Sequence, residues 1–367
     1  MMWQLLKNLT SLVMLGWILY SWVFRSDPRL PCPDPEHADP LIQPECFFSE
    51  NFLASRALFR SAAKKAGAEL HLLTLSDSLA IDVAVLPAKT QKGMVMLHFS
   101  GTHGVEGYVG SAIQSATLTQ IASKKLRSEK TLIFVHGLNV FGMANWRRFN
   151  ENNVDLNRNA LFTDKKLQEL LNRDPNIAGY ENWTSHFNPT EKPTGFGDAM
   201  RLFHVARALA LSSFSSLKRA MVTGTYSNSR GIFFGGRSLQ ASHAAVREFL
   251  HNEGYLEQTK QLILIDVHSG LGPWGRDTLM MNDHYNEVKN LYGTPNNKTT
   301  GLEWVPPFAL EIQSLAVGKG NIASDGYDVV TGDVQSQYPL LFSNLEFLVS
   351  VSQEFGTYPA PLVVSFF

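Results

Sequence analysis

Residues 262–270 read Leu-Ile-Leu-Ile-Asp-Val-His-Ser-Gly, and this stretch decides the fold. Its first six residues form an apolar run that only Asp266 interrupts. A run of this length bounded by a glycine is typical of a strand buried on both faces, as in a parallel sheet covered by helices. We therefore expect residues 262–267 to be a central strand of an α/β sheet, with His268 just beyond its end.

Apolar runs and helical patterns alternate on both sides of this strand. Strands are expected at Ile81–Leu86, Met94–Phe99, Thr131–Val135, around Ala220–Thr225 and in the alternating segment 348–352. Helices are expected over residues 50–66, 108–124, 198–212 and 239–252, the last with Ser238 as its cap. Residues 160–195 and 284–335 are expected to be irregular insertions. The alternation predicts a mixed, mostly parallel twisted sheet with helices on both faces, an α/β/α sandwich.

The composition is that of a packed globular protein. Of the 367 residues, 44% are hydrophobic and 18% are charged, so the chain can bury a large core. The formal net charge is −1, and no run of Lys or Arg is longer than two residues. Binding to nucleic acid requires a basic surface that follows the phosphate backbone. The sequence therefore argues against a nucleic-acid partner.

The first 49 residues differ from the rest of the chain. Residues 9–24 are uncharged and mostly apolar. This run is shorter than the roughly 20 residues of a spanning helix and slightly longer than the core of a signal peptide. No small-residue cleavage site follows directly, so residues 1–25 favour an uncleaved signal anchor over a removed signal peptide. Residues 26–49 are rich in proline and indicate a linker before a single domain over 50–367.

Whether residues 1–25 are a signal anchor or a signal peptide, they predict entry into the secretory pathway. The protein would be membrane-anchored by a single pass or secreted, with its main domain lumenal or extracellular. The only two cysteines, Cys32 and Cys46, could pair in an oxidising compartment and close a short loop. Their positions make them poor candidates for a metal site in the main domain.

Polar clusters follow two of the predicted buried strands. His103 and Glu106 lie in the sequence Gly-Thr-His-Gly-Val-Glu-Gly after the strand at 94–99. The glycines allow a sharp turn that aims an imidazole and a carboxylate at one point. His268 ends the central strand, and ligands of open α/β sheets gather beyond such strand ends. A His/Glu/His set leaves one position of a zinc ion open for water, the arrangement of catalytic zinc sites.

A third cluster, Val-Asp-Leu-Asn-Arg-Asn over residues 154–159, would by itself indicate only a polar turn. Together with Gly-Thr-His-Gly-Val-Glu-Gly, Asp-x-His-x-Gly-Leu-Gly-Pro from Asp266 and Glu-Phe-Gly-Thr from Glu354, it resembles the M14 metallocarboxypeptidase superfamily. The Asp-Leu-Asn-Arg sequence is also similar to that of the deacylase branch, which contains succinylglutamate desuccinylase and aspartoacylase. The closest resemblance is to the DUF2817 branch, and it extends from about residue 50 to residue 358.

The resemblance implies a metal centre. His103, Glu106 and His268 match the ligands of one zinc ion. Asp155 matches the carboxylate that accepts a hydrogen bond from a ligand histidine and so fixes its orientation. The resemblance thus implies a zinc carboxypeptidase-like fold with a single metal at the strand ends.

The resemblance also implies substrate and catalytic roles. Asn157 and Arg158 match a pair that grips a substrate carboxylate, a task that suits the guanidinium fork. Arg148, or less plausibly Arg147, matches the arginine that polarises the scissile carbonyl. Glu354 matches the general base that takes a proton from water. Tyr226 and Tyr285 are alternatives for a substrate-binding tyrosine.

The function expected from these features is zinc-dependent hydrolysis of amide bonds by a carboxypeptidase-type metallopeptidase. One alternative is a zinc deacylase that acts on small N-acyl amino acids, so the partner would be a peptide or an N-acyl amino acid. Another is an inactive scaffold tethered to a membrane by its N-terminal segment. The chain ends 13 residues after Glu354, which is short for such relatives. His98 and His136 could approach the site, but neither has a ligand spacing.

Overall fold

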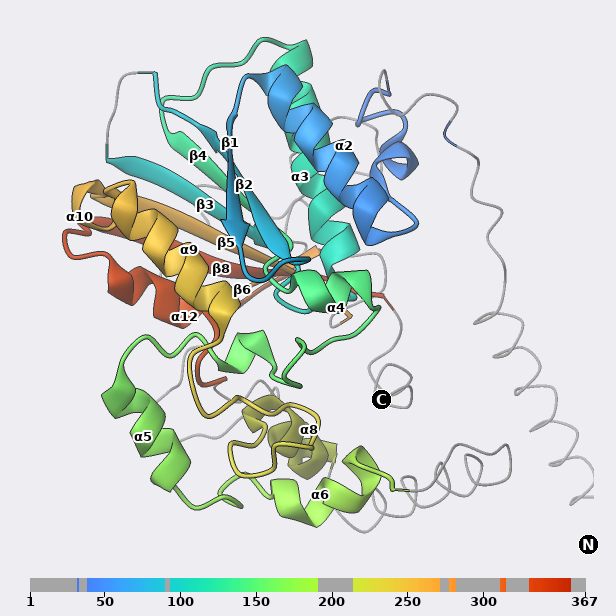
Figure 1. The fold of residues 1–367 in the computed structure, drawn as a ribbon, viewed down its shortest axis with the longest axis vertical. Helices are drawn as coiled ribbons and strands as arrows, with labels where there is room; N and C mark the ends of the chain where they lie inside the picture. The colour runs from blue at the N-terminus through green and yellow to red at the C-terminus, as the bar shows by residue number, and fades with distance from the viewer. Residues whose placement is uncertain are drawn as a thin grey trace, which may run out of the picture.

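The protein was examined as a computed structural model, which describes residues 32, 38–89, 93–190, 214–270, 277–281, 311–314 and 330–357. An eight-stranded sheet runs through it in the order β1-β2-β4-β3-β5-β8-β6-β7 (Figure 1). The strands are β1 (Glu69–Thr74), β2 (Ala80–Leu86), β3 (Met94–Ser100), β4 (Thr131–His136), β5 (Gln261–Ser269), β6 (Asp277–Met281), β7 (Glu311–Ser314) and β8 (Phe347–Phe355).

The centre of the sheet is parallel. β3 pairs in parallel with β4 on one side and with β5 on the other, and β5 pairs in parallel with β8. Antiparallel pairs join β2 to β1 and β4, and β6 to β8. The predicted mixed, mostly parallel sheet is confirmed, and all of its parallel central strands end at the same edge.

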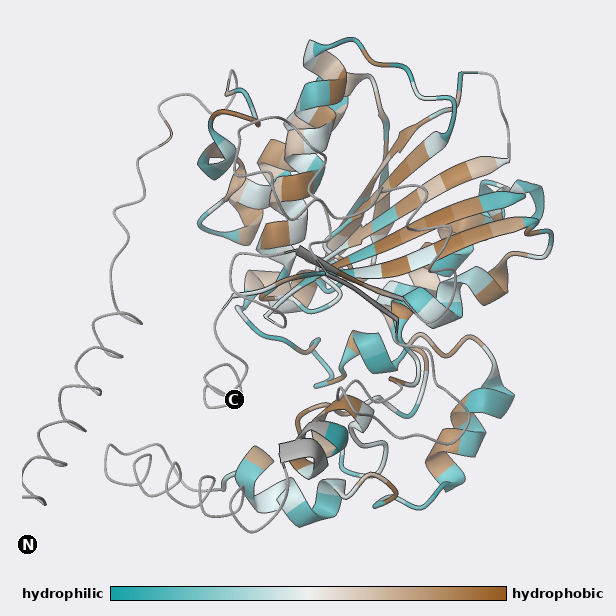
Figure 2. Ribbon diagram, turned by 180° about the vertical axis from the view of Figure 1, so that it is seen from behind, coloured by the Kyte–Doolittle hydropathy of each residue, from teal (hydrophilic) through white to brown (hydrophobic). Residues whose placement is uncertain are grey.

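Helices cover both faces of this sheet. On one face lie α2 (Phe52–Ala66) and α3 (Gly107–Ser123), and on the other lie α9 (Ala241–Asn252), α10 (Tyr255–Gln258) and α12 (Val334–Gln337). Alternate strand residues point to opposite faces, so Val83 and Val85 pack with Val246 of α9, whereas Ala84 packs with Phe59 of α2. Figure 2 shows the central strands as mostly hydrophobic. The predicted α/β/α arrangement is therefore confirmed.

Short elements complete the described chain. These are η1 (Pro44–Phe47), α4 (Val140–Ala144), η2 (Leu156–Arg158), α5 (Asp164–Asn172), α6 (Tyr180–Phe187), α8 (Phe214–Thr223) and η3 (Tyr338–Leu341). Figure 1 shows α5, α6 and α8 gathered on one side of the molecule, below the sheet. Trp183 and Phe187 of α6 pack there with Leu217 of α8 and with Phe149 and Phe233. This lobe lies next to the segment that carries Asp155 and Arg158.

Several local predictions were wrong. The stretch predicted as a strand around Ala220–Thr225 instead contains the last turn of helix α8. The residue that caps α9 is Gln240, not Ser238. Residues 160–190 contain α5 and α6, so they are not irregular, and β7 lies within 284–335. The predicted helix over 198–212 lies outside the described residues.

The predicted localisation also needs correction. Within the described ranges, no helix is both long enough and apolar enough to cross a bilayer, which contradicts the predicted single-pass anchor. The apolar segment 9–24, on which that prediction rested, lies outside those ranges. Cys32 and Cys46 do form the predicted disulfide, which is compatible with secretion.

Candidate metal centre

The ends of β3 and β5 bring His103, Glu106 and His268 together. One ligand atom from each residue lies within 4.8 Å of the others. β3 and β5 are neighbours in the sheet, so the loop after β3 meets the end of β5. This loop turns at Gly101, which has a φ of 69°, and a Cβ on Gly104 would lie 2.1 Å from a backbone carbon of Gly142. The glycines of the motif thus allow a tightly folded loop.

The two imidazoles present the same nitrogen to the centre. Nδ1 of His103 lies 2.9 Å from Oε1 of Glu106, and Nδ1 of His268 lies 3.3 Å from Oε2. The two Nδ1 atoms are 3.2 Å apart. The backbone N–H of Ser269 donates to Oε2 of Glu106 over 3.0 Å and holds the carboxylate in place. Two nitrogens and a carboxylate therefore converge on one small, buried volume.

The other nitrogen of each imidazole faces a buried carboxylate. Nε2 of His103 lies 3.1 Å from Oδ1 of Asp155, and Nε2 of His268 lies 2.7 Å from Oδ2 of Asp266. The hydroxyl of Thr102 donates to Oδ1 of Asp266 over 2.7 Å. Histidines that ligate metals commonly donate their second N–H to such a carboxylate. The donor set and its surroundings therefore fit a metal ion bound through both Nδ1 atoms.

Asp266 and Thr102 were not assigned a role from the sequence. A signal for Asp266 was present, because residues two apart in a strand point to the same face. The Asp-Val-His sequence therefore places the carboxylate beside the imidazole of His268. Thr102 offered no comparable signal, since its contact depends on how the loop after β3 folds over β5.

Charge within the cluster keeps Glu106 ionised. Burial alone would raise its pKa, but His103 and His268 beside it hold the pKa of Glu106 well below the usual range. Burial opposes protonation of His268, yet Asp266 outweighs this effect and the pKa of His268 is raised well above its ordinary value. A carboxylate that is ionised at neutral pH is ready to act as a metal ligand.

Arg148 lies at the edge of this cluster. Its Nη1 donates to Oε1 of Glu106 over 3.1 Å and its Nε donates to Oδ2 of Asp155 over 3.2 Å. Its Nη2 lies 2.8 Å from Nε2 of His103. The side chain is 16% exposed, so Arg148 is less buried than the two histidines. The structure therefore brings Arg148 next to the candidate ligands.

Asn157 and Arg158 follow Asp155 in the short helix η2. Oδ1 of Asn157 accepts a hydrogen bond from the backbone of Val334, and this side chain is half-buried. Arg158 is only 4% exposed and donates to Asp155 and to two backbone carbonyls of α8. The pKa of Asp155 is held well below its usual range despite burial, chiefly by Arg158.

Glu354 lies beside the ligands on the next strand. It is the register partner of His268 in the parallel pair of β5 and β8, so both side chains project from the same face. Glu354 is 8% exposed, and among the described residues its Oε2 has no hydrogen-bond partner. Burial raises the pKa of Glu354 to about 7. A carboxylate with such a pKa can take up and release a proton at neutral pH.

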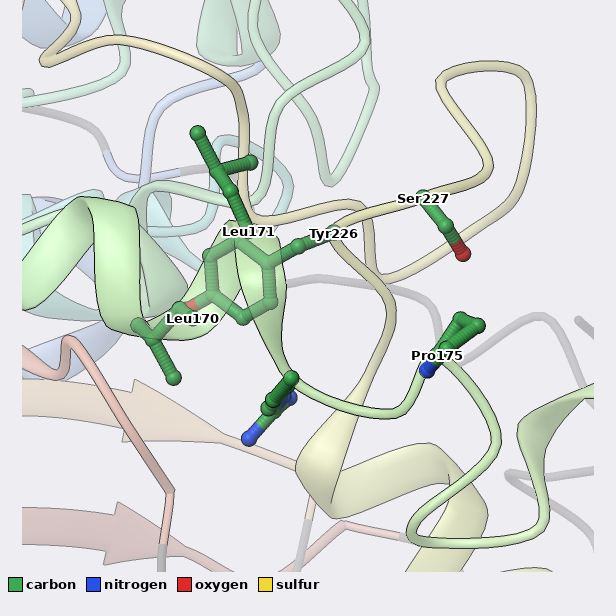
Figure 3. Close-up of a pocket in the computed structure, with 6 residues that line it drawn as sticks. Leu170, Leu171, Pro175, Tyr226 and Ser227 are labelled. Carbon is green, nitrogen blue, oxygen red and sulfur yellow. The ribbon is translucent and has the colours of Figure 1, made fainter.

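His98, His136 and Tyr226 make contacts outside the candidate ligand set. His98 is within hydrogen-bonding distance of Gln114, His136 is within that distance of Ser111, and burial lowers the pKa of each imidazole to about 4. The hydroxyl of Tyr226 lies 2.6 Å from the carbonyl oxygen of Arg158, and its ring lines a small pocket beside α5 (Figure 3). Tyr285 and His284 lie outside the described residues.

These features define an α/β/α protein whose parallel strand ends carry a possible His/Glu/His metal site. The chain belongs to the DUF2817 family, described as "Protein of unknown function (DUF2817)", whose profile matches residues 48–366. The resemblance to this family, drawn from the four motifs, is thereby confirmed. No curated protein sequence matches the chain significantly.

Solved structures similar to the chain include several carboxypeptidases. Carboxypeptidase A from Helicoverpa armigera is 12% identical, with 94% of this chain and 71% of that chain covered and a TM-score of 0.48. Thrombin activatable fibrinolysis inhibitor is 12% identical, with 89% and 70% covered and a TM-score of 0.48. A metallo-carboxypeptidase from Burkholderia cenocepacia is 11% identical, with 84% and 64% covered and a TM-score of 0.44.

Proposed function

We propose that the protein is a zinc-dependent hydrolase of amide bonds, with the chemistry of a carboxypeptidase-type metallopeptidase. The observation that carries this proposal is the convergence of His103, Glu106 and His268 on one point, with Glu354 beside them. Two imidazole nitrogens and one carboxylate are a ligand set that suits catalytic zinc and leaves a position open. When bound, zinc lowers the pKa of a coordinated water to about 7 and polarises a carbonyl oxygen.

Glu354 is the proposed general base. Its Oε2, which has no hydrogen-bond partner among the described residues, supports this role, because a carboxylate beside the ligands can accept a proton from the attacking water. It would then pass that proton to the nitrogen of the leaving amine. The position of Glu354 on the same face of the sheet as His268 supports attack next to the ligands.

Arg148 is the proposed partner of the developing oxyanion. Its contact with Glu106 and its partial exposure support this role, since a guanidinium at the edge of the centre can donate to a carbonyl oxygen that gains charge. Asn157, which is half-buried and close in sequence to Asp155, remains the proposed contact for a polar group of the substrate. The proposed substrates are peptides or N-acyl amino acids.

The test combines metal content with a substrate panel. Purified protein reconstituted with zinc is expected to hold about one zinc per chain. It is also expected to hydrolyse members of a panel of peptides and N-acyl amino acids. Turnover of the N-acyl amino acids alone would replace the peptidase with a deacylase. Bound zinc without any turnover, or binding well below one zinc per chain, would favour an inactive scaffold and contradict the proposal.

A further inference from the structure

Arg158 is buried, and both of its terminal nitrogens donate hydrogen bonds within the protein. Its Nη1 donates to Oδ2 of Asp155, and its Nη2 donates to the carbonyl oxygens of Met221 and Val222 over 2.8 and 3.0 Å. Both hydrogens of Nη2 are thus in use. Its Cζ lies 5.1 Å from the centroid of the Phe233 ring. A bidentate grip on a substrate carboxylate uses Nη2 together with either Nη1 or Nε. Since Nη2 has no hydrogen left, this arrangement does not offer such a grip.

The contact with α8 has a clear physical reason. Met221 and Val222 lie in the last turn of this helix, where carbonyl oxygens lack partners within the helix and carry its negative dipole end. The guanidinium of Arg158 satisfies two of them from outside the helix. Gly224 follows with a φ of 64°, and a Cβ there would lie 2.7 Å from Cδ and Nε of Arg158. The end of α8 therefore closes directly over this side chain.

The contact with Asp155 connects this enclosure to the metal centre. Oδ2 of Asp155 faces Arg158, and Oδ1 faces Nε2 of His103. The carboxylate plane is therefore fixed at one end by a buried guanidinium and at the other by the imidazole. Arg148 also reaches Asp155, but it is partly exposed and also contacts Glu106. The two arginines thus differ, since of these two only Arg148 contacts the candidate ligands and is partly exposed.

We infer that Arg158 is a positioning residue, which ties the C-terminal carbonyls of α8 to Asp155 and thereby orients His103, and that it does not bind the substrate. This inference rests on the proposed metal centre and assigns Arg158 a role different from the one that the family resemblance implies. Lysine cannot replace the arginine fully, because a single ammonium does not reproduce the planar fork that meets the carboxylate and two carbonyls together.

The test compares Arg158→Gln with wild type in the full-length protein. Zinc affinity is measured by competition with a chromophoric chelator, and the geometry of the site by the visible spectrum of the cobalt-loaded protein. Loss of a group that orients a ligand histidine typically lowers metal affinity about 10- to 100-fold. For Arg158→Gln we therefore expect zinc affinity at least about 10-fold lower than in the wild type, and an altered cobalt spectrum. Arg158→Lys is expected to recover part of this loss. Arg173→Gln, which removes an arginine stacked on Tyr226 in the same lobe, is the control and should leave both readouts unchanged.

Two further measurements separate positioning from substrate binding. In an Asp155→Asn background, Arg158→Gln should cause little additional loss of zinc affinity, because the path to His103 is already broken. The second measurement uses two substrates, one with a free carboxylate and the other with the corresponding amide. Arg158→Gln should lower kcat for both substrates and leave the ratio of their KM values unchanged. If Arg158→Gln does not fold, Arg158→Lys provides the same two readouts, because it keeps the charge and loses only the planar fork.

The outcomes are distinguishable from failure of the proposed function. Unchanged zinc affinity and cobalt spectrum in Arg158→Gln, with a selective rise of KM for the free carboxylate, would overturn the inference and leave the hydrolase intact. Absence of turnover in a wild-type protein that binds zinc would contradict only the proposed function, since the metal readouts need no substrate. Absence of zinc binding by the wild type would overturn both.

Discussion

His268 and Glu354 are partners in register on the adjacent parallel strands β5 and β8. Their side chains therefore leave the sheet on the same face, one in the candidate metal site and the other beside it. Because both residues belong to the paired centre of the sheet, their relative position is set by backbone hydrogen bonds. The ends of two paired central strands are a rigid support for groups that must stay a fixed distance apart during a reaction.

Replacement of Glu354 by glutamine should leave zinc bound and greatly slow hydrolysis. Glutamine keeps the shape of the side chain but cannot accept the proton, and loss of a general base typically costs about 10²- to 10⁴-fold in rate. Steady-state kinetics and elemental analysis on the same sample check this. Glu346→Gln is the matched control, because Glu346 lies just before the other end of β8 and is exposed. An unaltered rate in Glu354→Gln would remove this residue from the mechanism.

The stability of the metal-free protein should depend on the protonation of Glu354. Its pKa is raised by burial from about 4.5 to about 7, so the folded protein holds a proton that the unfolded chain has lost in this window. The stabilising contribution is thus fully present below about pH 4.5 and is lost as the pH rises to about 7. Glutamine does not titrate, so wild type should lose stability relative to Glu354→Gln across this window.

Thermal unfolding of the two metal-free proteins from pH 4.5 to pH 8 measures this difference. Metal-free samples are needed because a bound dication would itself lower the pKa of a nearby carboxyl group. A pH-independent difference between the two melting temperatures would show that Glu354 titrates normally in the folded protein.

Asp266 should support the metal site through His268. Its carboxylate lies 2.7 Å from Nε2 of this imidazole, and removal of such a partner typically weakens metal binding about 10- to 100-fold. Asp266→Asn is therefore expected to lower zinc affinity in a chelator competition. Thr102→Val removes only a hydrogen bond to Asp266 and should have a smaller effect. Equal zinc affinities for Asp266→Asn and wild type would contradict this role.

Replacement of Arg148 should lower the rate of hydrolysis. If this residue stabilises an oxyanion, Arg148→Ala should lower kcat by about 10²- to 10³-fold, as for loss of other oxyanion donors. The neighbouring Arg147 is exposed and serves as the matched control. A larger loss of kcat in Arg147→Ala than in Arg148→Ala would transfer the role to Arg147.

The sequence predicted the centre of the fold and the main candidate ligands for a definite reason. Apolar runs such as 262–267 have few alternatives to a buried strand, and polar residues that directly follow them must meet at one sheet edge. The prediction failed around Ala220–Thr225, because a short apolar run does not distinguish a strand from the end of a buried helix. The enclosure of Arg158 could not be foreseen either, since it depends on this helix end, about 60 residues further along the chain.

Zinc content per chain is the most direct test of the central claim that His103, Glu106 and His268 form a metal site. Elemental analysis after reconstitution and dialysis should find about one zinc in the wild type and in the control His251→Ala, whose imidazole is exposed. His268→Ala should retain little or none. Less than about half an equivalent in the wild type, or the same content in His268→Ala as in the wild type, would contradict the proposed metal site.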